Sequence, residues 1–396
     1  MVRRLIFLCA IVALAILAGT SRTVAQTTII MTDTHSATDP KGAIREARES
    51  IAAGKMDVAI AQLEAYVQAH PGELEPHRFL GDLYMRIGQP DKAKAVYLQI
   101  LATAPRDRET HNRLGTVYAV ENQVDAAIAQ FSAALPGTDS VDDLVSLHQR
   151  RGDLNAYRMQ IESAARQDPG DAGTLSELGQ IYNALHQSYS AVRYLKSALD
   201  DDPDDLTSQN ALGLAYLNLG QYSDATDEFR HCLRSDPEMY SCADNLGATL
   251  LEMGDYTEAK VTLDRAYRMA PERGETFVNY GYLEDAQGNW QGAIAQYARA
   301  ISTWPFVREA YIDIGLDYEE HHLYTLAQQV LVKGIASVND DGRMHFLLGR
   351  AYEMQGDRSD ALTQFKLAST GTDPTAVRIG AERFSELTSS ETPQPQ

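Results

Sequence analysis

Residues 206–239 read LTSQNALGLAYLNLGQYSDATDEFRHCLRSDPEM, and this stretch decides the fold. Its apolar residues recur at the spacing of two amphipathic helices, and Gly220 lies between the two runs. Pro237 follows the second run, where a proline cannot continue the hydrogen-bond ladder of a helix. The stretch therefore predicts two antiparallel helices joined by a short turn, which we call helix A and helix B.

The same pattern recurs along most of the chain. Glycines that follow a large apolar residue are 34 residues apart, except for one step of 64 that accommodates a shortened connection and a divergent copy. An alanine column follows twelve residues after the glycines, and both columns are small because helices A and B cross closest there. A bulky column, which includes Tyr97 and Phe229, fills the space between the helices. The glycines are Gly81, Gly115, Gly179, Gly213, Gly247, Gly281, Gly315 and Gly349.

These columns resemble the tetratricopeptide repeat, in which Leu-Gly, Tyr, Ala, Phe, Ala and Pro recur at fixed places within 34 residues. The copy in residues 206–239 has, at these places, Leu212, Gly213, Tyr216, Ala225, Phe229 and Pro237. The resemblance covers ten consecutive copies, from about residue 40 to residue 375. It implies an all-α fold, an α-solenoid that winds as a right-handed superhelix of about ten helical hairpins and ends in a C-terminal capping helix.

Departures from the pattern set the expected boundaries. Repeats one to three should occupy residues 40–137, a divergent fourth repeat 138–171, and repeats five to ten 172–375. In the fourth repeat, Val145 replaces the glycine and Tyr157 the small alanine, so its helices must lie further apart or shift in register. We expect a bend there, after the short connection 136–138, and a disordered tail at 388–396. The capping helix is expected at 376–387, and its buried face should comprise Val377, Ala381, Phe384 and Leu387.

The first 25 residues predict a signal peptide. Arg3 and Arg4 precede an apolar run at 5–18, and Thr23 and Ala25 suit the −3 and −1 places of a signal-peptidase site. The run is shorter than the roughly 20 apolar residues of a membrane span. We therefore expect cleavage after Ala25, a flexible segment at 26–39, an extracytoplasmic (periplasmic or secreted) location, and no membrane insertion of the mature chain. The alternative is a retained N-terminal membrane anchor.

The charge and the motifs exclude several functions. The formal net charge is −20, and an acidic surface repels phosphate backbones, so we expect no nucleic-acid partner. The sequence contains no phosphate-binding loop, no nucleophile elbow and no His-Glu-x-x-His pair. His321 and His322 are adjacent near an A–B turn without a third ligand, which favours a turn over a metal site. We expect no enzyme activity, no metal and no cofactor.

Two cysteines follow the leader. Cys232 lies in the last turns of one helix B, and Cys242 lies early in the next helix A, so the two helices are packed neighbours. Export would make a disulfide chemically feasible. The alternative is two small buried thiols, because the sequence does not fix the geometry that a disulfide needs.

The resemblance also implies a partner-binding groove. In the family, A helices line the concave surface, and the second, fifth, sixth, ninth, twelfth and thirteenth places of a repeat tend to point inward. The sixth place gives Asn245, Asn279 and Asp313, which resemble the asparagine ladder of relatives that grip an extended peptide; the alternative is three unrelated solvent-facing residues. Apolar residues expected on the same face are Val278, Tyr282, Ile312, Leu316 and Phe346. The other end of this face is basic and offers Arg45, Arg48, Arg78, Arg86 and Arg113.

These features predict a non-enzymatic extracytoplasmic scaffold or adaptor that binds protein or peptide segments in the concave groove. The alternative is a component of an envelope complex for polysaccharide export or modification, or for secretion. The sequence names no partner, because the recurring columns all serve packing.

Overall fold

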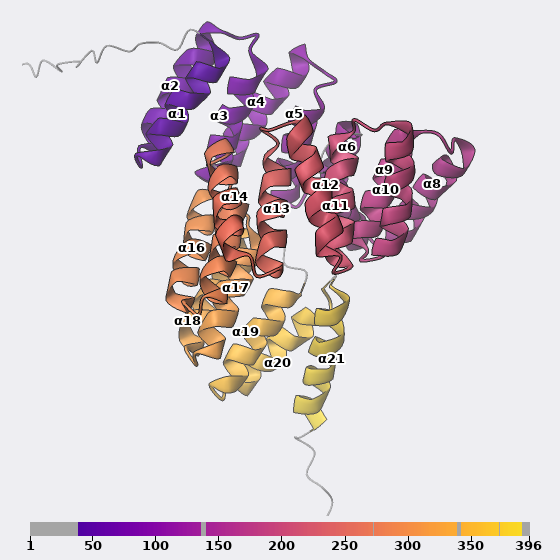
Figure 1. Ribbon diagram of the computed structural model, residues 1–396. Coiled ribbons are helices and arrows are strands. Elements are labelled where there is room, and N and C mark those ends of the chain that lie inside the picture. The colour runs from indigo at the N-terminus through magenta and orange to yellow at the C-terminus, as the bar shows by residue number, and fades with distance from the viewer. Residues whose placement is uncertain (1–38, 136–139, 272, 339–341, 372, 390–396) are drawn as a thin grey trace, which may run out of the picture. The chain divides into compact units, whose positions relative to one another are not determined.

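The structure is a computed structural model and describes residues 39–135, 140–271, 273–338, 342–371 and 373–389. Within these ranges the chain is all-α and forms 21 helices. The first twenty make ten consecutive antiparallel hairpins, and the last helix packs against the tenth hairpin (Figure 1). This arrangement confirms the expected α-solenoid of ten helical hairpins and a final helix.

Odd-numbered helices up to α19 are the A helices, and even-numbered helices are the B helices. The A helices are α1 (Pro40–Ala52), α3 (Leu74–Arg86), α5 (Arg108–Val120), α7 (Ser140–Arg151), α9 (Ala172–Ala184), α11 (Leu206–Asn218), α13 (Tyr240–Glu252), α15 (Glu275–Ala286), α17 (Arg308–Glu320) and α19 (Arg343–Met354). The B helices are α2 (Met56–Ala69), α4 (Pro90–Thr103), α6 (Val124–Ala134), α8 (Leu154–Gln167), α10 (Ser188–Asp201), α12 (Tyr222–Ser235), α14 (Tyr256–Met269), α16 (Trp290–Thr303), α18 (Tyr324–Ser337) and α20 (Arg358–Ala368). The final helix is α21 (Pro374–Ser389).

The two helices of a hairpin approach each other most closely at the glycine column. A Cβ atom added at Gly247 would lie 2.5 Å from Cδ2 of Leu263, and one added at Gly213 would lie 2.5 Å from Cε1 of Phe229. These distances are too short for a carbon side chain, so the bulky residue on helix B requires a glycine opposite it. The alanine column is buried in the same interface, as at Ala259.

The turn between helices A and B uses the left-handed backbone region. Gly220 has a φ of 69° there, which costs a glycine nothing. Three repeats place another residue at the same point: Asn122 and His322 have φ of 59°, and His186 has φ of 55°. His321 and His322 therefore lie in the turn after α17, as the sequence predicted.

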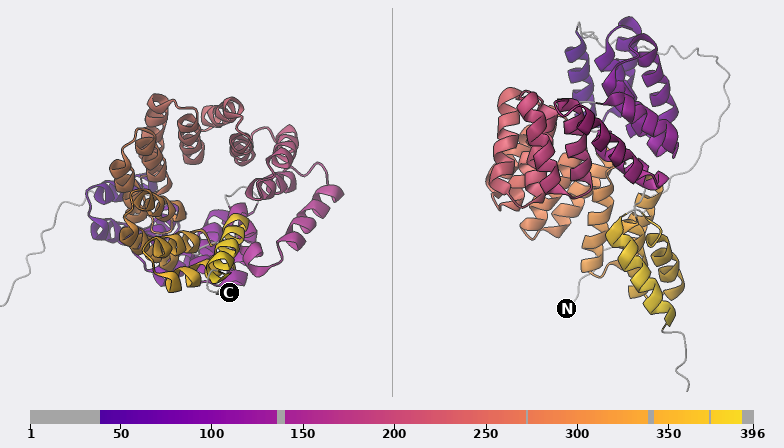
Figure 2. Two further views of the ribbon diagram at one scale, coloured as in Figure 1. Left: turned by 90° about the horizontal axis from the view of Figure 1, so that it is seen from below. Right: turned by 90° about the vertical axis from the view of Figure 1, so that its right-hand side faces the viewer.

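The A helices form a continuous layer. Each hairpin packs on the next, and several neighbouring A helices also contact each other, as α13 contacts α15 and α17 contacts α19. The hairpins follow one another in the order of the sequence (Figure 2). We call the surface of the A helices that is turned away from the B helices the A face.

The fourth hairpin departs from the others as expected. Helices α7 and α8 pack less closely than the two helices of any other described hairpin. Tyr157, at the place of the small alanine, is buried and stacks on His148 with ring centroids 4.1 Å apart. Its hydroxyl donates to Glu177 in α9 at 2.8 Å, so the large side chain joins the fourth hairpin to the fifth. The connection 136–138 lies outside the described residues.

Helix α21 is longer than predicted, and its most buried residues differ from the predicted ones, although Val377, Phe384 and Leu387 are partly buried as expected. Asp373 caps it by accepting a hydrogen bond from the Ala376 backbone at 2.6 Å, and Thr388 and Ser389 are helical although a tail was expected there. Ala376 and Gly380 are buried, whereas Ala381, predicted for the buried face, is exposed. The reason is a close approach to α20: a Cβ atom at Gly380 would lie 2.9 Å from Cβ of Ala368.

The predicted signal peptide at 1–25, nearly all of the predicted flexible segment at 26–39 and most of the predicted tail at 388–396 lie outside the described residues. Among the helices that the structure does describe, none has the length and apolar character needed to cross a membrane.

We predict that Gly247→Leu destabilises the protein by roughly 2–4 kcal/mol, because the new side chain would occupy the space of Leu263. Urea unfolding followed by circular dichroism measures the change. Glu252→Leu is the control: it introduces the same side chain at an exposed site of the same helix and should change stability by about 0.5 kcal/mol or less. Similar losses in both variants would show that the glycine column does not mark the A–B contact.

Candidate partner-binding groove

The asparagines of the sixth place join neighbouring repeats. Nδ2 of Asn245 donates to Oδ1 of Asn210 at 2.9 Å, and Nδ2 of Asn279 donates to Oδ2 of Asp244 at 2.9 Å. In both cases the acceptor is the fifth-place residue of the preceding repeat. The amide donors thus bind within the protein, which reduces what they can offer to a peptide.

Asn279 is also only 9% exposed. The prediction that it lies on an accessible inner surface, outside the core, is therefore wrong. Its replacement would leave the buried Asp244 carboxylate without one of its donors, so Asn279 supports the fold. Asn245 remains partly exposed.

Two of the apolar residues predicted for the groove are also buried. Val278 and Ile312 occupy the fifth place of their repeats and lie in the core cluster of the last three hairpins. The physical reason is that the fifth place faces the next A helix, which covers it. These two residues hold repeats together and do not line an open surface.

The ninth place is the one that stays open. Tyr282 and Leu316 occupy it in α15 and α17 and are 40% and 41% exposed. The Tyr282 hydroxyl donates to Oδ2 of Asp313 at 2.9 Å, so the third member of the predicted ladder binds a tyrosine of the preceding repeat. Phe346 in α19 is partly buried and packs against the same core cluster.

A groove continues this surface beyond Leu316. It has a volume of about 790 Å³ and is lined by residues of α17, α19 and α21 together with the turn after α17 and Tyr324, the first residue of α18. Phe346 and Met354 join Leu316 as its apolar part, and Met354 is 59% exposed. The volume is within the range of pockets that bind small molecules or a few side chains.

Ion pairs brace the walls of the groove. Arg350 in α19 lies 2.8 Å from the buried Glu319 of α17. Nε of Arg383 in α21 donates to Oε2 of Glu353 in α19 at 3.0 Å. The two arginines therefore bind carboxylates of the groove itself, and α21 contributes a wall as well as a cap.

Three aspartates lie beside the groove on α15 and α17. Burial raises the pKa of Asp313 to about 7 and that of Asp317 to about 6, and the negative charges of neighbouring carboxylates act in the same direction. Burial also raises the pKa of Asp285, which accepts a hydrogen bond from Tyr297 at 2.6 Å. The A face of the eighth and ninth hairpins therefore brings together carboxylates whose ionised forms are disfavoured by burial and by one another.

The basic end of the A face differs from the prediction in a similar way. Arg78 binds Asp107 at 3.0 Å, and Nε of Arg113 binds Asp82 at 3.0 Å, in each case between neighbouring repeats. Arg113 also binds Glu109. These arginines neutralise carboxylates of the same surface and connect the first repeats.

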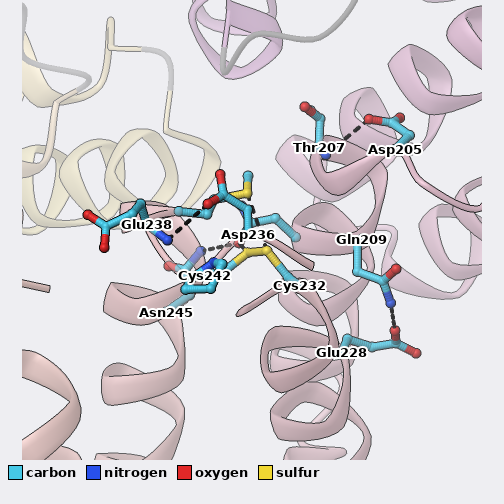
Figure 3. The surroundings of a disulfide bond; sticks show 12 residues. Asp205, Thr207, Gln209, Glu228, Cys232, Asp236, Glu238, Cys242 and Asn245 are labelled. Atoms are coloured by element: carbon cyan, nitrogen blue, oxygen red, sulfur yellow. Dashed lines mark hydrogen bonds between the residues drawn. A yellow bond between two sulfur atoms is a disulfide. The ribbon is translucent and has the colours of Figure 1, made fainter. Parts of the chain in front are cut away.

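Cys232 of α12 and Cys242 of α13 form a disulfide in the structure (Figure 3). Their Cα atoms are 6.4 Å apart, and both residues are fully buried. Sγ of Cys242 lies 3.5 Å from Oδ1 of Asn210, the acceptor of the Asn245 amide. Of the two alternatives, the structure has the bonded one, and it links the sixth hairpin to the seventh next to a polar pair.

The described residues contain no group of three or more His, Cys, Asp or Glu side chains arranged to hold a metal ion. Nδ1 of His321 lies 2.9 Å from the carbonyl oxygen of Asp317, and Nδ1 of His322 lies 2.8 Å from the Tyr324 hydroxyl. Both histidines thus make local contacts around the turn.

Two family models, each described as tetratricopeptide repeat, match this chain. One matches residues 50–114, and the other matches residues 176–239 and 245–307. The chain is a tetratricopeptide repeat protein. The family is generally one of protein-binding scaffolds and is typically non-enzymatic. In this tetratricopeptide repeat protein the matched segments lie on either side of the divergent fourth hairpin.

Two solved structures are similar to this tetratricopeptide repeat protein. A tetratricopeptide repeat protein from Parabacteroides merdae ATCC 43184 is 18% identical and covers 63% of this chain and 100% of its own, with a TM-score of 0.46. Yeast Tom70 is 12% identical and covers 89% of this chain and 96% of its own, with a TM-score of 0.48. No curated protein matches the chain.

We predict that Asp244→Asn removes part of the pH dependence of stability. Burial raises the pKa of the Asp244 carboxyl to about 6, against the opposing effect of the Asn279 hydrogen bond. Between pH values of about 4 and 6 the folded protein then keeps a proton that the unfolded chain has lost, so stability falls as the pH rises. In the variant this fall in the free energy of unfolding should be smaller by at most about 2–3 kcal/mol.

Urea unfolding at pH 4.5 and pH 7 tests this. Asp200→Asn, at an exposed site of α10, is the control and should follow the parent. If Asp244→Asn also follows the parent at both pH values, the carboxyl does not titrate as a buried group.

We predict that Cys232 and Cys242 are bonded in the protein isolated from its own compartment. The closed loop is short, since the two residues are 10 apart in sequence, so the bond should stabilise the fold by at most about 2–3 kcal/mol. Peptide mass spectrometry without reduction, after alkylation of free thiols under denaturing conditions, decides the matter. Two fully alkylated cysteines would reject the bond.

Proposed function

We propose that this protein is a non-enzymatic scaffold or adaptor that works outside the cytoplasm. It binds segments of other proteins on the A face of the seventh to tenth hairpins. The observation that carries the proposal is the pair of exposed ninth-place residues, Tyr282 and Leu316, next to a groove of about 790 Å³. The Tyr282 ring also packs edge-on against Tyr297 of α16, with ring centroids 5.9 Å apart. Packing between helices A and B does not account for the exposed Leu316, and exposed apolar patches often mark interaction sites.

The location rests on two further observations. The first 25 residues have the charge and apolar pattern of a signal peptide. The buried disulfide between α12 and α13 supports an oxidising compartment, because disulfides seldom persist in the cytosol. Cell fractionation tests the location: recovery of the protein in the cytoplasmic fraction with its leader intact would contradict it.

We predict that a photo-crosslinking amino acid at Leu316 forms covalent adducts with another protein in the cells that make this chain. The same amino acid at Val332, an exposed apolar site on helix B of the same hairpin, is the control and should give few adducts. Mass spectrometry identifies the partner. Adducts with polysaccharide synthase or porin components would favour the alternative of an envelope complex, and equal yields at the two sites would place the binding surface elsewhere.

A further inference from the structure

We infer that the partner segment carries a lysine or arginine next to an apolar side chain. The apolar side chain would lie on Leu316 in the groove, and the cation would lie among Asp285, Asp313 and Asp317 beside it. This inference rests on the proposed function and specifies the chemistry of the ligand that the A face binds.

Several apolar side chains of the groove are exposed to solvent and could contact a partner. Leu316 is the centre of this surface, with Tyr282 on the preceding A helix and Phe346 and Met354 on the following one. A bound apolar side chain would remove these groups from water, which favours binding in proportion to the area covered. The hydrogen bond from Tyr282 to Asp313 joins α15 to α17, and α17 packs on α19, so an extended segment that crosses these helices meets each in turn.

Charge complementarity identifies the rest of the segment. Asp313 interacts unfavourably with Glu309, Asp317 and Asp285, and Asp317 interacts unfavourably with Asp285 and Glu320. Among the described residues, the basic side chains that interact with this cluster include His321, beside Asp317 and Asp285, and Arg343, beside Tyr282. The arginines of the groove, Arg350 and Arg383, already bind Glu319 and Glu353. Negative charge is therefore in excess.

The carboxylates of the cluster are accessible to a bound cation. Asp285, Asp313 and Asp317 are each only partly buried. An ammonium or guanidinium group beside them would offset the repulsion among the carboxylates, and charge-assisted hydrogen bonds are stronger than neutral ones. An acidic segment would increase the repulsion.

The test uses a defined probe. A bead library of acetylated and amidated nine-residue peptides is screened with the fluorescently labelled full mature chain. We expect the selected peptides to be enriched in lysine or arginine adjacent to a large apolar residue. The most frequent peptide is then titrated by calorimetry against the parent protein and two variants.

Asp313→Asn with Asp317→Asn should weaken binding of that peptide by about tenfold, because two attractive charges are lost and their size is kept. Asp200→Asn with Asp201→Asn changes the net charge equally at an exposed end of α10 and should leave the affinity within about twofold. Replacing the basic residue of the peptide by glutamine should also weaken its binding, in this case to the parent protein, and by about the same tenfold factor. That comparison needs no change in the protein, so it holds even if the variant folds poorly.

Other outcomes separate this inference from the proposed function. The library could select neutral or acidic peptides that bind the parent and the double aspartate variant equally but bind Leu316→Ala more weakly. That result would overturn the inference about charge and leave the groove as the binding site. The inference would also be overturned if none of these variants changed the affinity of the selected peptides, or if the library yielded no binder. The crosslinking yields at Leu316 and Val332 would then decide the proposed function by themselves.

Discussion

Each hairpin depends on one contact, a glycine of helix A against a bulky side chain of helix B, as between Gly247 and Leu263. Because the glycine has no side chain, the two helices can approach until the bulky group fills the space between them. This contact sets the rotation of helix A about its own axis. Once that rotation is set, the fifth place faces the next A helix and the sixth place faces the preceding one, as the pairs Asn210–Asn245 and Asp244–Asn279 show. The properties of the A face follow from that geometry.

The buried polar groups of the A layer are consistent with this constraint. Asn210 with Asn245, and Asp244 with Asn279, join the fifth place of one repeat to the sixth place of the next. A buried polar group is tolerated when it has a partner and is costly when it has none. Each pair therefore favours one relative position of the two neighbouring A helices along their axes. Apolar side chains alone would specify that position less sharply. The disulfide between α12 and α13 links the same hairpins covalently, next to the first of these pairs.

The sequence was sufficient to predict the hairpins because the same packing contacts recur in each repeat. The glycine, alanine and bulky columns recur at one spacing, so an error at one copy is corrected by the others. The accessibility of the A face was harder to predict because it depends on the next repeat. Val278 and Ile312 point inward by their place and are nevertheless covered, and Asn279 is buried against Asp244. Helix α21 has no repeat to follow it, and its buried face is set by the approach of Gly380 to Ala368, which has no counterpart in the columns.

Charge on the A face illustrates why a count of residues cannot identify a binding surface. The first repeats carry several arginines, yet Arg78 and Arg113 are bound to carboxylates of neighbouring repeats. The eighth and ninth hairpins carry aspartates whose main neighbours are other carboxylates, and burial makes their ionised forms less stable. Such groups lower the stability of the free protein, and a cation that binds among them recovers that free energy. We therefore expect the groove beside Leu316 to be the part of the A face where a partner would gain from both apolar contact and charge.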